Sequence, residues 1–355
     1  MSFGWSRNSL RCSGLPEPAA SKPVAFRRAL LGWYEAVRRD LPWRESTDFY
    51  TVWISEIMLQ QTRVEAVIPY YQRFLERFPD LAALAAAPEQ DVLAAWSGLG
   101  YYSRARNLQR AAKQVVAEGM PATHEEILRL PGIGVYTAAA VASISLNLPY
   151  AAVDGNVIRV VSRLTNDASE SSAPAARRRF AETAQLLLDA RRPGDFNQAM
   201  MELGATICKP ANPLCGECPV ARFCAAREAG TERELPVKLR KQQTREVPLH
   251  LLLLRREGEL FLIQRQSAAR RLADFWELPE LPAAPSTRRH RLVAGFSHQI
   301  VNDRFRVSVW EPPSDAPPEG GRWVPEAELA TLPLTTITRK ALSLSQRNPQ
   351  SVVPV

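Results

Sequence analysis

The sequence predicts an all-α domain followed by a smaller α+β domain. With 355 residues, the chain is long enough for two domains that each bury their own core. Through residues 24–228, periodic apolar stretches are joined by short turns marked by Pro or Gly, which is typical of successive helices. After residue 247, short β-prone runs take their place. The helical stretches expected in the first part are 26–37, 49–62, 64–77, 88–97 and 104–118.

The composition is that of a globular protein, with 46% hydrophobic and 23% charged residues. No apolar run approaches the ~20 residues that cross a bilayer, and the first 22 residues lack the apolar core of a secretory signal. Membrane, secreted and fibrous proteins are therefore excluded. The net charge of +8 favours polyanion partners only modestly, and an Arg-rich composition explains it equally well.

Changes of composition predict the domain boundaries. Residues 229–246 are polar and charged with one Pro, as in a linker. Beyond them, β-prone runs such as 248–256, 258–266, 291–301 and 304–312 alternate with turns, and helix-like segments follow at 325–331 and 338–345. We expect a flexible tail over 1–22, a helical domain over 23–228, a linker over 229–246, an α+β domain over 247–346 and a tail over 347–355.

Four of the five cysteines are close together at the end of the helical part. Cys208, Cys215, Cys218 and Cys224 have the spacing C-x6-C-x2-C-x5-C, which suits a metal centre better than a disulfide framework. Zinc sites usually use two CxxC pairs or add His, and this loop has one CxxC and no His nearby. One compact four-thiolate loop favours a [4Fe–4S] cluster. Cys12 is expected to be an ordinary free thiol.

Residues 123–143 form a predicted pair of helices with a glycine-rich turn. Thr123 and Glu126 have the spacing of a capping box, and Gly132 and Gly134 precede a second helix from about Val135. Glycines before a helix start leave backbone N–H groups that can bind a phosphodiester. This is the helix-hairpin-helix pattern of DNA-binding proteins, although a plain helix–helix turn has the same glycines.

Two carboxyl groups have contrasting predicted surroundings. Glu56 lies among apolar neighbours on a helix, where burial raises the pKa of a carboxyl and lets it donate a proton near neutral pH. Asp154 stands at a helix N-terminus, where free N–H groups stabilise its anion. An exposed Glu and a simple helix cap are the alternatives. Together, however, the pair predicts a proton donor beside an anion that offsets a developing cation.

Six motifs follow one another over about 185 residues: LPWR (41–44), WISEIMLQQTRV (53–64), GLGYYSRARNL (98–108), LPGIGVYTA (130–138), VDGNVIRV (153–160) and the four-cysteine loop. With these motifs in this order, the chain resembles the adenine DNA glycosylases of the MutY type. The resemblance implies an all-α helix-hairpin-helix glycosylase domain with a [4Fe–4S] loop, followed by a smaller α+β Nudix-like domain. The broader endonuclease III superfamily shares the hairpin, the Asp and the cluster.

The resemblance also implies roles for individual residues. Glu56 would protonate the flipped adenine at N7, and Asp154 would stabilise the oxocarbenium ion, with Tyr136 and Asn156 as hydrogen-bond supports. Bifunctional relatives have a Lys where this chain has Tyr136, so we expect a monofunctional enzyme that uses water. The implied DNA contacts are Arg44, Leu59, Gln60, Gln61, Thr62 and Tyr101, which wedges into the base stack, together with Gly132 and Gly134 of the hairpin. The position of the cysteine loop after the last helix makes Lys209 and Arg222 candidate phosphate contacts, with support of the fold alone as the alternative role of the loop.

The C-terminal part resembles the Nudix-like domain of the family. A Nudix hydrolase needs a Glu-rich helix to hold metal, and residues 280–291 read ELPAAPSTRRHR, which is proline-broken and basic. We therefore expect recognition, not hydrolysis. The resemblance implies 8-oxoguanine as the ligand, read by Phe296, Ser297 and His298 on a turn. The linker has no Cys and no His, so the zinc site of animal relatives is not expected.

The expected function is hydrolytic release of adenine from 8-oxoguanine:A or G:A pairs in duplex DNA, by a cytoplasmic, nucleoid-associated bacterial monomer. Two alternatives stay open: a bifunctional endonuclease III-type lyase acting on oxidised pyrimidines, and a non-catalytic DNA-binding protein. Tyr136 and the extra domain argue against the first, and the Glu56–Asp154 pair argues against the second.

Overall fold

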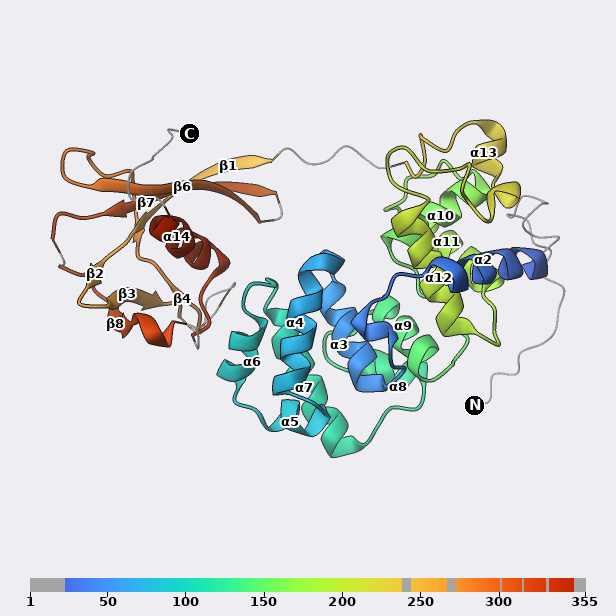
Figure 1. The fold of residues 1–355 in the computed structure, drawn as a ribbon, viewed down its shortest axis with the longest axis horizontal. Coiled ribbons are helices and arrows are strands. Elements are labelled where there is room, and N and C mark those ends of the chain that lie inside the picture. The colour runs from blue at the N-terminus through green and yellow to red at the C-terminus, as the bar shows by residue number, and fades with distance from the viewer. Residues whose placement is uncertain are drawn as a thin grey trace. The chain divides into compact units, whose positions relative to one another are not determined.

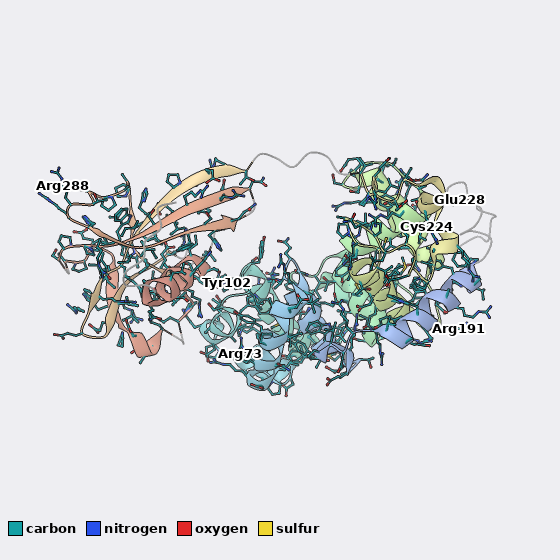
Figure 2. The ribbon with its side chains drawn as sticks, turned by 45° about the horizontal axis from the view of Figure 1, so that its top comes forward. Arg73, Tyr102, Arg191, Cys224, Glu228 and Arg288 are labelled. Atoms are coloured by element: carbon teal, nitrogen blue, oxygen red, sulfur yellow. The ribbon has the colours of Figure 1, made fainter. Side chains whose placement is uncertain are left out.

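A computed structural model describes residues 23–237, 244–266, 272, 274–300, 302–314, 316–329 and 332–347. The predicted tail over 1–22, with Cys12, lies outside the described residues, as do linker residues 238–243. Of the predicted tail over 347–355, only Arg347 is described, and it ends the last helix. Apart from one helix near the C-terminal end, the α-helices precede the strands along the chain, as the apolar periodicity predicts (Figure 1; Figure 2 adds the side chains). In the described part of the chain, no helix is long and apolar enough to cross a membrane.

The described residues form two compact units. Unit 1 takes residues up to 60 and from 119 to 237, and unit 2 takes residues 61–118 and those from 244 onward. The segment 61–118 is helical, as expected, but it groups with the α+β part of the chain. The domain boundaries 23–228 and 247–346 stay predictions.

In its described residues, unit 1 consists of helices and loops, with one isolated β-bridge between Glu170 and Val237. Its elements are α2 (Pro23–Val37), η1 (Pro42–Arg44), α3 (Phe49–Leu59), α8 (His124–Arg129), α9 (Val135–Ser145), α10 (Gly155–Thr165), α11 (Pro174–Leu187), α12 (Pro193–Thr206), η2 (Ala221–Phe223) and α13 (Ala225–Ala229). Helices α2, α10, α11 and α12 enclose its main core. Phe26 of α2 is fully buried there, with its ring 6.3 Å from that of Phe196 and 5.7 Å from that of Phe223. Because Phe223 follows the third cysteine, this core also supports the cysteine loop.

The residues predicted to begin the linker are part of unit 1. Leu235 is buried, and its carbonyl accepts a hydrogen bond from the buried Arg163 at 3.0 Å. This part of the predicted linker therefore packs within unit 1, and the linker bounds 229–246 stay a prediction. An apolar side chain and a carbonyl acceptor for a buried guanidinium outweigh the polar composition of the segment.

The predicted hairpin is confirmed. Thr123 and Glu126 form the capping box of α8, and α9 begins at Val135. Gly132 adopts a φ of 78°, which L side chains rarely tolerate. Gly134 is the N-cap of α9 and offers no side chain to cap its first turn. The hairpin directs α9 against α3 and α12, which places Tyr136 between them.

In its described residues, unit 2 combines five α-helices with two small sheets. Its elements are α4 (Val64–Arg77), α5 (Leu81–Ala86), α6 (Glu89–Trp96), α7 (Ser103–Glu118), β1 (Arg245–Leu252), β2 (Arg255–Arg256), β3 (Glu259–Gln264), β4 (Trp276–Glu277), β5 (Glu280–Leu281), β6 (Arg291–Ile300), β7 (Asp303–Glu311), β8 (Gly321–Pro325), η3 (Glu326–Glu328) and α14 (Thr336–Arg347). One sheet has the order β5-β1-β7-β6, in which β1 and β7 are parallel. The other sheet joins β2, β3 and β4, with β8 paired to β3. Both sheets and α14 contribute to one core.

The segment 280–291 contains no helix. Strand β5 is followed by turns up to the start of β6. This agrees with the proline-rich sequence there, in which a helix would lose backbone hydrogen bonds.

Candidate active site

Unit 1 brings four of the predicted site residues together. Glu56 lies on α3, Tyr136 on the first turn of α9, and Asp154 and Asn156 at the start of α10. The Tyr136 hydroxyl donates a hydrogen bond to Glu56 Oε2 at 2.8 Å. The charge of Asp154 acts on both Glu56 and Tyr136, so the two carboxyl groups share one site.

Glu56 is the buried carboxyl that the sequence predicts. It is 6% exposed, and burial raises its pKa to about 7, with the Asp154 charge adding to the rise. The Tyr136 hydrogen bond and the Arg44 charge oppose the shift. Burial also raises the pKa of Tyr136 well above its usual value, so its hydroxyl keeps the proton that it donates. At neutral pH, Glu56 can therefore both hold and release a proton.

Asp154 caps α10 as predicted, but its pKa moves in the unexpected direction. Its Oδ1 accepts the Val157 N–H at 2.7 Å, and its Oδ2 accepts from Asn156 Nδ2 at 2.7 Å. Burial nevertheless raises the pKa of Asp154, and these hydrogen bonds with the Arg159 charge only partly offset that rise. The helix N-terminus thus limits the cost of burying the anion and does not hold its pKa below the usual value.

Asn156 is held from two sides. Its Oδ1 accepts from Arg159 Nη2 at 2.8 Å, and α12 passes close to it at Gly204. A Cβ at Gly204 would lie 2.6 Å from Asn156 Cβ, closer than two carbons approach. Gly204 is therefore required for α10 and α12 to pack at this distance. The sequence gives little indication of it, because a glycine inside a helix usually only lowers helix propensity.

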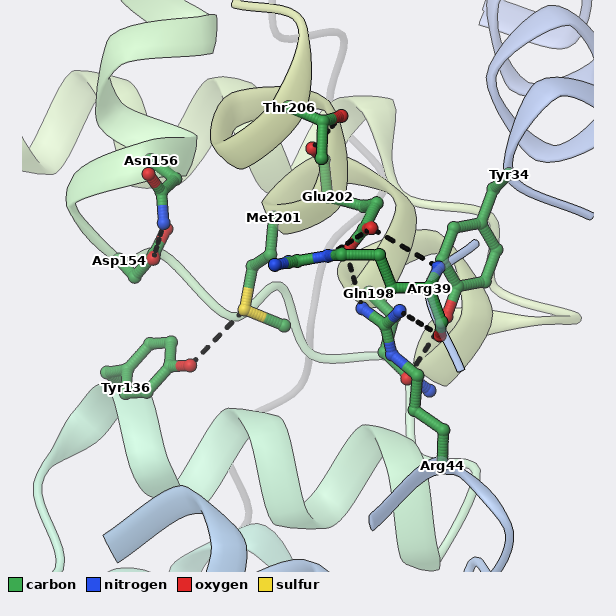
Figure 3. A network of polar contacts seen from close by, with 10 residues as sticks. All are labelled: Tyr34, Arg39, Arg44, Tyr136, Asp154, Asn156, Gln198, Met201, Glu202 and Thr206. Atoms are coloured by element: carbon green, nitrogen blue, oxygen red, sulfur yellow. Dashed lines mark hydrogen bonds and ion pairs between the residues drawn. The ribbon is translucent and has the colours of Figure 1, made fainter. Parts of the chain in front are cut away.

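A second polar network surrounds the buried Glu202 on α12 (Figure 3). Arg39 donates to both carboxylate oxygens, at 2.7 Å and 3.0 Å, and Arg44 donates to Glu202 Oε2 at 2.7 Å. Burial acts to raise the pKa of Glu202, but the two arginines hold it below its usual value. The Arg44 guanidinium also lies 5.4 Å from the Tyr34 ring centroid, and Tyr34 donates to Gln198 Oε1 at 3.1 Å.

Helix α12 carries residues of both networks. Met201 Sδ lies 3.2 Å from the Tyr136 hydroxyl oxygen, and the next residue, Glu202, binds the arginines (Figure 3). Arg44, predicted beside the flipped base, is thus fixed by an ion pair that the motif does not contain. The one sequence feature that could have indicated this ion pair is Glu202 itself, the single carboxylate in the mostly uncharged stretch 196–203.

The four predicted cysteines line one pocket, together with Arg163 and Arg227. All four are partly buried free thiols. Arg163 is 1% exposed; its Nη1 lies 3.2 Å from Cys208 Sγ and 2.8 Å from the Lys209 carbonyl oxygen. A guanidinium that donates to sulfur fits a thiolate ligand. Within the described ranges, no three His, Cys, Asp or Glu side chains are placed to hold a single metal ion.

Arg159 joins the carboxyl site to the cysteine loop. One turn before Arg163 on α10, it donates to Asn156, to the Gly204 carbonyl at 2.7 Å and to the Cys208 carbonyl at 2.7 Å. The sequence gives no signal for its burial, because Arg159 and Arg163 share the polar face of α10 with Asn156 and Ser162, a pattern typical of an exposed face.

Comparison with known proteins agrees with this geometry. Residues 54–185 match the family described as HhH-GPD superfamily base excision DNA repair protein. The adenine DNA glycosylase of Homo sapiens is 33% identical over 406 residues, covering 91% of this chain and 74% of the human protein. That of Mus musculus is 32% identical over 407 residues, covering 92% and 79%.

The chain belongs to the adenine DNA glycosylase family. It is therefore an N-glycosylase of base excision DNA repair. Among solved structures, a thermostable thymine-DNA glycosylase is 29% identical with a TM-score of 0.54, covering 59% of this chain and 98% of that one. A non-covalent endonuclease III–DNA complex, at 20% identity and a TM-score of 0.50, covers 59% and 97% and shares the fold.

The predicted DNA contacts of the glycosylase lie in both units. In unit 1, Leu59 ends α3, and Gln60 Nε2 donates to Thr137 Oγ1 at 3.1 Å. In unit 2, Gln61 is exposed and adopts a φ of 59°, and Thr62 is partly buried. Lys209 and Arg222 are exposed in the cysteine loop.

The predicted reading turn is wrong, because Phe296, Ser297 and His298 lie within β6. Ser297 pairs with Arg306 and His298 with Phe305 of β7. Phe296 is 8% exposed in the core of unit 2, as expected for the inward position of a strand. Ser297 is exposed and His298 partly so.

The raised pKa of Glu56 predicts a pH-dependent loss of stability. In the unfolded chain the carboxyl ionises near 4.5, and in the folded protein near 7. Between these pH values the unfolded chain has lost a proton that the folded protein still holds, so the free energy of unfolding falls as the pH rises. Above pH 7 both states are ionised, and the loss of stability stays constant. Relative to Glu56→Gln, the free energy of unfolding should fall by about 3 kcal/mol over this range, measured by urea unfolding. A difference that does not vary with pH would contradict the assignment.

The close contact at Gly204 predicts a local defect. Gly204→Ala should displace Asn156 from Asp154 and slow adenine release about tenfold or more, because small misplacements in a site are costly. Gly32→Ala on α2 is the matched control, since a Cβ there meets nothing within 4 Å. Single-turnover rates for both variants test this. Equal rates in the two would show that α10 and α12 can separate without harm.

Proposed function

We propose that the enzyme hydrolyses the N-glycosidic bond of adenine paired with 8-oxoguanine or guanine in duplex DNA, without cutting the strand. The observation that carries this proposal is the buried Glu56, with a pKa of about 7, hydrogen-bonded to Tyr136 and beside Asp154. A stacked adenine cannot reach such a buried pair, so the base must be flipped out of the duplex.

Glu56 gives its proton to N7 of the flipped adenine, which makes the base a neutral leaving group. As the bond from C1′ to the base breaks, the sugar gains oxocarbenium character. Asp154, held by Val157 N–H and Asn156, stabilises this cation or adds to C1′ transiently. Glu56, now ionised, then removes a proton from the water that attacks C1′, leaving an abasic site.

Position 136 argues against a lyase. A bifunctional enzyme needs an amine that attacks C1′, and the phenol of Tyr136 cannot form an imine. Its hydrogen bond to Glu56 instead supports a role in orienting the acid. The hairpin glycines Gly132 and Gly134, with Lys209 and Arg222, are proposed contacts to the DNA backbone.

The four cysteines are proposed to hold a [4Fe–4S] cluster. They line one pocket, and the buried Arg163 donates to Cys208 Sγ, which suits a thiolate ligand. When bound, the cluster would hold this loop rigid, so that its exposed Lys209 and Arg222 can contact the phosphate backbone. Iron and sulfide analysis of anaerobically purified protein should give about four of each per chain. Stoichiometric zinc without iron would overturn this assignment.

Residues 23–228 are proposed to perform catalysis, and the Nudix-like part, 247–346, to read 8-oxoguanine. The absence of a helix over 280–291 supports recognition without hydrolysis. Ser297 and His298 are the proposed reading pair. Burial and the nearby Lys340 lower the pKa of His298, so its imidazole is neutral at physiological pH and can both donate and accept. Oxidation turns N7 of guanine into a donor and adds a carbonyl at C8, which such a pair can detect.

The catalytic assignment is tested with a duplex that carries one 8-oxoguanine:adenine pair. Glu56→Gln should slow single-turnover adenine release by at least about a hundredfold while DNA binding stays within a few-fold, because only the proton is lost. Asp154→Asn should be similarly impaired, since an amide cannot offset a cation. The exposed Glu182→Gln of α11 is the control.

The same assay separates the alternatives. Strand breakage only after alkali supports the proposal, breakage without alkali supports a lyase, and no release supports a binding protein. Release by Glu56→Gln within tenfold of the wild type would remove Glu56 from the mechanism.

Reading of the lesion predicts a change in preference. Replacing Ser297 and His298 together with Ala should lower the preference for 8-oxoguanine:A over G:A about tenfold or more, because one or two hydrogen bonds are lost. The ratio of single-turnover rates on the two duplexes measures this. If both rates fall equally, the pair contributes to folding or general DNA binding instead.

A further inference from the structure

The loop between α6 and α7 presents one aromatic side chain to solvent. Tyr101 is 48% exposed, whereas Trp96 before it is fully buried and Tyr102 after it is 3% exposed. The backbone of Tyr101 adopts a φ of 50°, in the left-handed region that non-glycine residues rarely occupy. Such a conformation persists only where the surrounding structure determines it.

The base of the loop is fixed by two glycines. Gly98 and Gly100 have φ values of 110° and 71°. A Cβ at Gly98 would lie 2.0 Å from the Tyr70 hydroxyl oxygen, and the Gly98 N–H donates to the Tyr102 hydroxyl at 3.3 Å. The loop is therefore packed tightly enough to have one shape.

Arg104, on the first turn of α7, fixes the tip of the same loop. Its Nη2 donates to the carbonyl oxygens of Leu99 and Gly100, both at 3.2 Å. The Gly100 carbonyl also accepts from Trp96 Nε1 at 3.2 Å. The backbone N–H of Arg104 donates to the Tyr101 carbonyl at 2.8 Å.

The Arg104 guanidinium is also close to both aromatic rings. Its central carbon lies 5.5 Å from the ring centroid of Trp96 and 5.5 Å from that of Tyr101. These are cation–π distances, and partial burial strengthens the attraction. Burial lowers the pKa of Arg104 to about 10, which still leaves the guanidinium charged at neutral pH.

We propose that Arg104 is a positioning residue that holds Tyr101 in the orientation in which it enters the base stack. This rests on the proposed function, in which Tyr101 is the wedge. The alternative role for an arginine in a DNA-binding loop is a direct contact with a phosphate. The carbonyl and ring contacts of Arg104 favour the positioning role, because they direct the guanidinium toward its own loop. A planar fork can make these contacts together, and an ammonium group cannot.

The test compares Arg104→Met, Arg104→Lys, Tyr101→Ala and the double variant Tyr101→Ala/Arg104→Met in the full chain. The readouts are single-turnover adenine release, the fluorescence change of 2-aminopurine placed beside the mispair, and the salt dependence of DNA affinity. Arg104→Met and Arg104→Lys should both slow release about tenfold and lose most of the fluorescence change. The double variant should be no worse than Tyr101→Ala, and the salt slope of Arg104→Met should equal that of the wild type.

Arg110→Met, which removes an exposed cation from the same helix, is the control for charge. Thermal unfolding checks the fold of each variant, and Arg104→Lys carries the test if Arg104→Met unfolds. Wild-type behaviour of Arg104→Lys would overturn the proposal. A second result would also overturn it. In that result the rate losses of the two single variants multiply in the double variant, and the salt slope of Arg104→Met falls by about one, which indicates a lost phosphate contact. If Tyr101→Ala itself behaves as the wild type, the wedge role in the proposed function fails instead.

Discussion

Burial of the Glu56 carboxyl is the constraint on which the rest of the site depends. A carboxyl that is 6% exposed loses most of its hydration, and its pKa rises to about 7. The hydroxyl of Tyr136 keeps the group oriented and makes its anion tolerable once the proton has left. Asp154 in the same site adds to the pKa rise of Glu56, so each carboxyl influences the protonation of the other.

Helices α10 and α12 hold this arrangement in place. Their close contact at Gly204 sets the position of Asn156, which donates to Asp154. Arg159 links Asn156 to the Cys208 carbonyl, so a change in the cysteine loop has a direct route to the carboxyl site. On the other side of α12, Glu202 fixes Arg44, whose charge lowers the pKa of Glu56. The acid strength of the site is thus a balance among several helices.

The sequence predicts the features that depend on local patterns. Three local patterns in the sequence agree with the structure. Glu56 is buried on α3, Thr123 and Glu126 form a capping box, and the four cysteines line one pocket. Features that depend on contacts between segments far apart in the sequence could not be predicted from local patterns. The Gly204–Asn156 approach, the Glu202 ion pairs and the burial of Leu235 involve partners that are far apart in the chain. The pKa of Asp154 was misjudged for the same reason, since burial is a tertiary property. The pairing of Ser297 with Arg306 likewise extends a strand through a polar stretch that looks like a turn.

The pH dependence of adenine release tests the central claim most directly. If Glu56 donates its proton from a site with a pKa of about 7, the single-turnover rate on an 8-oxoguanine:adenine duplex should be constant below pH 7 for as long as Asp154 stays ionised. It should then fall tenfold for each unit of pH above about 7. A rate that stays constant well above pH 7, or that falls already near 4.5, the value of an ordinary glutamate, would contradict the account.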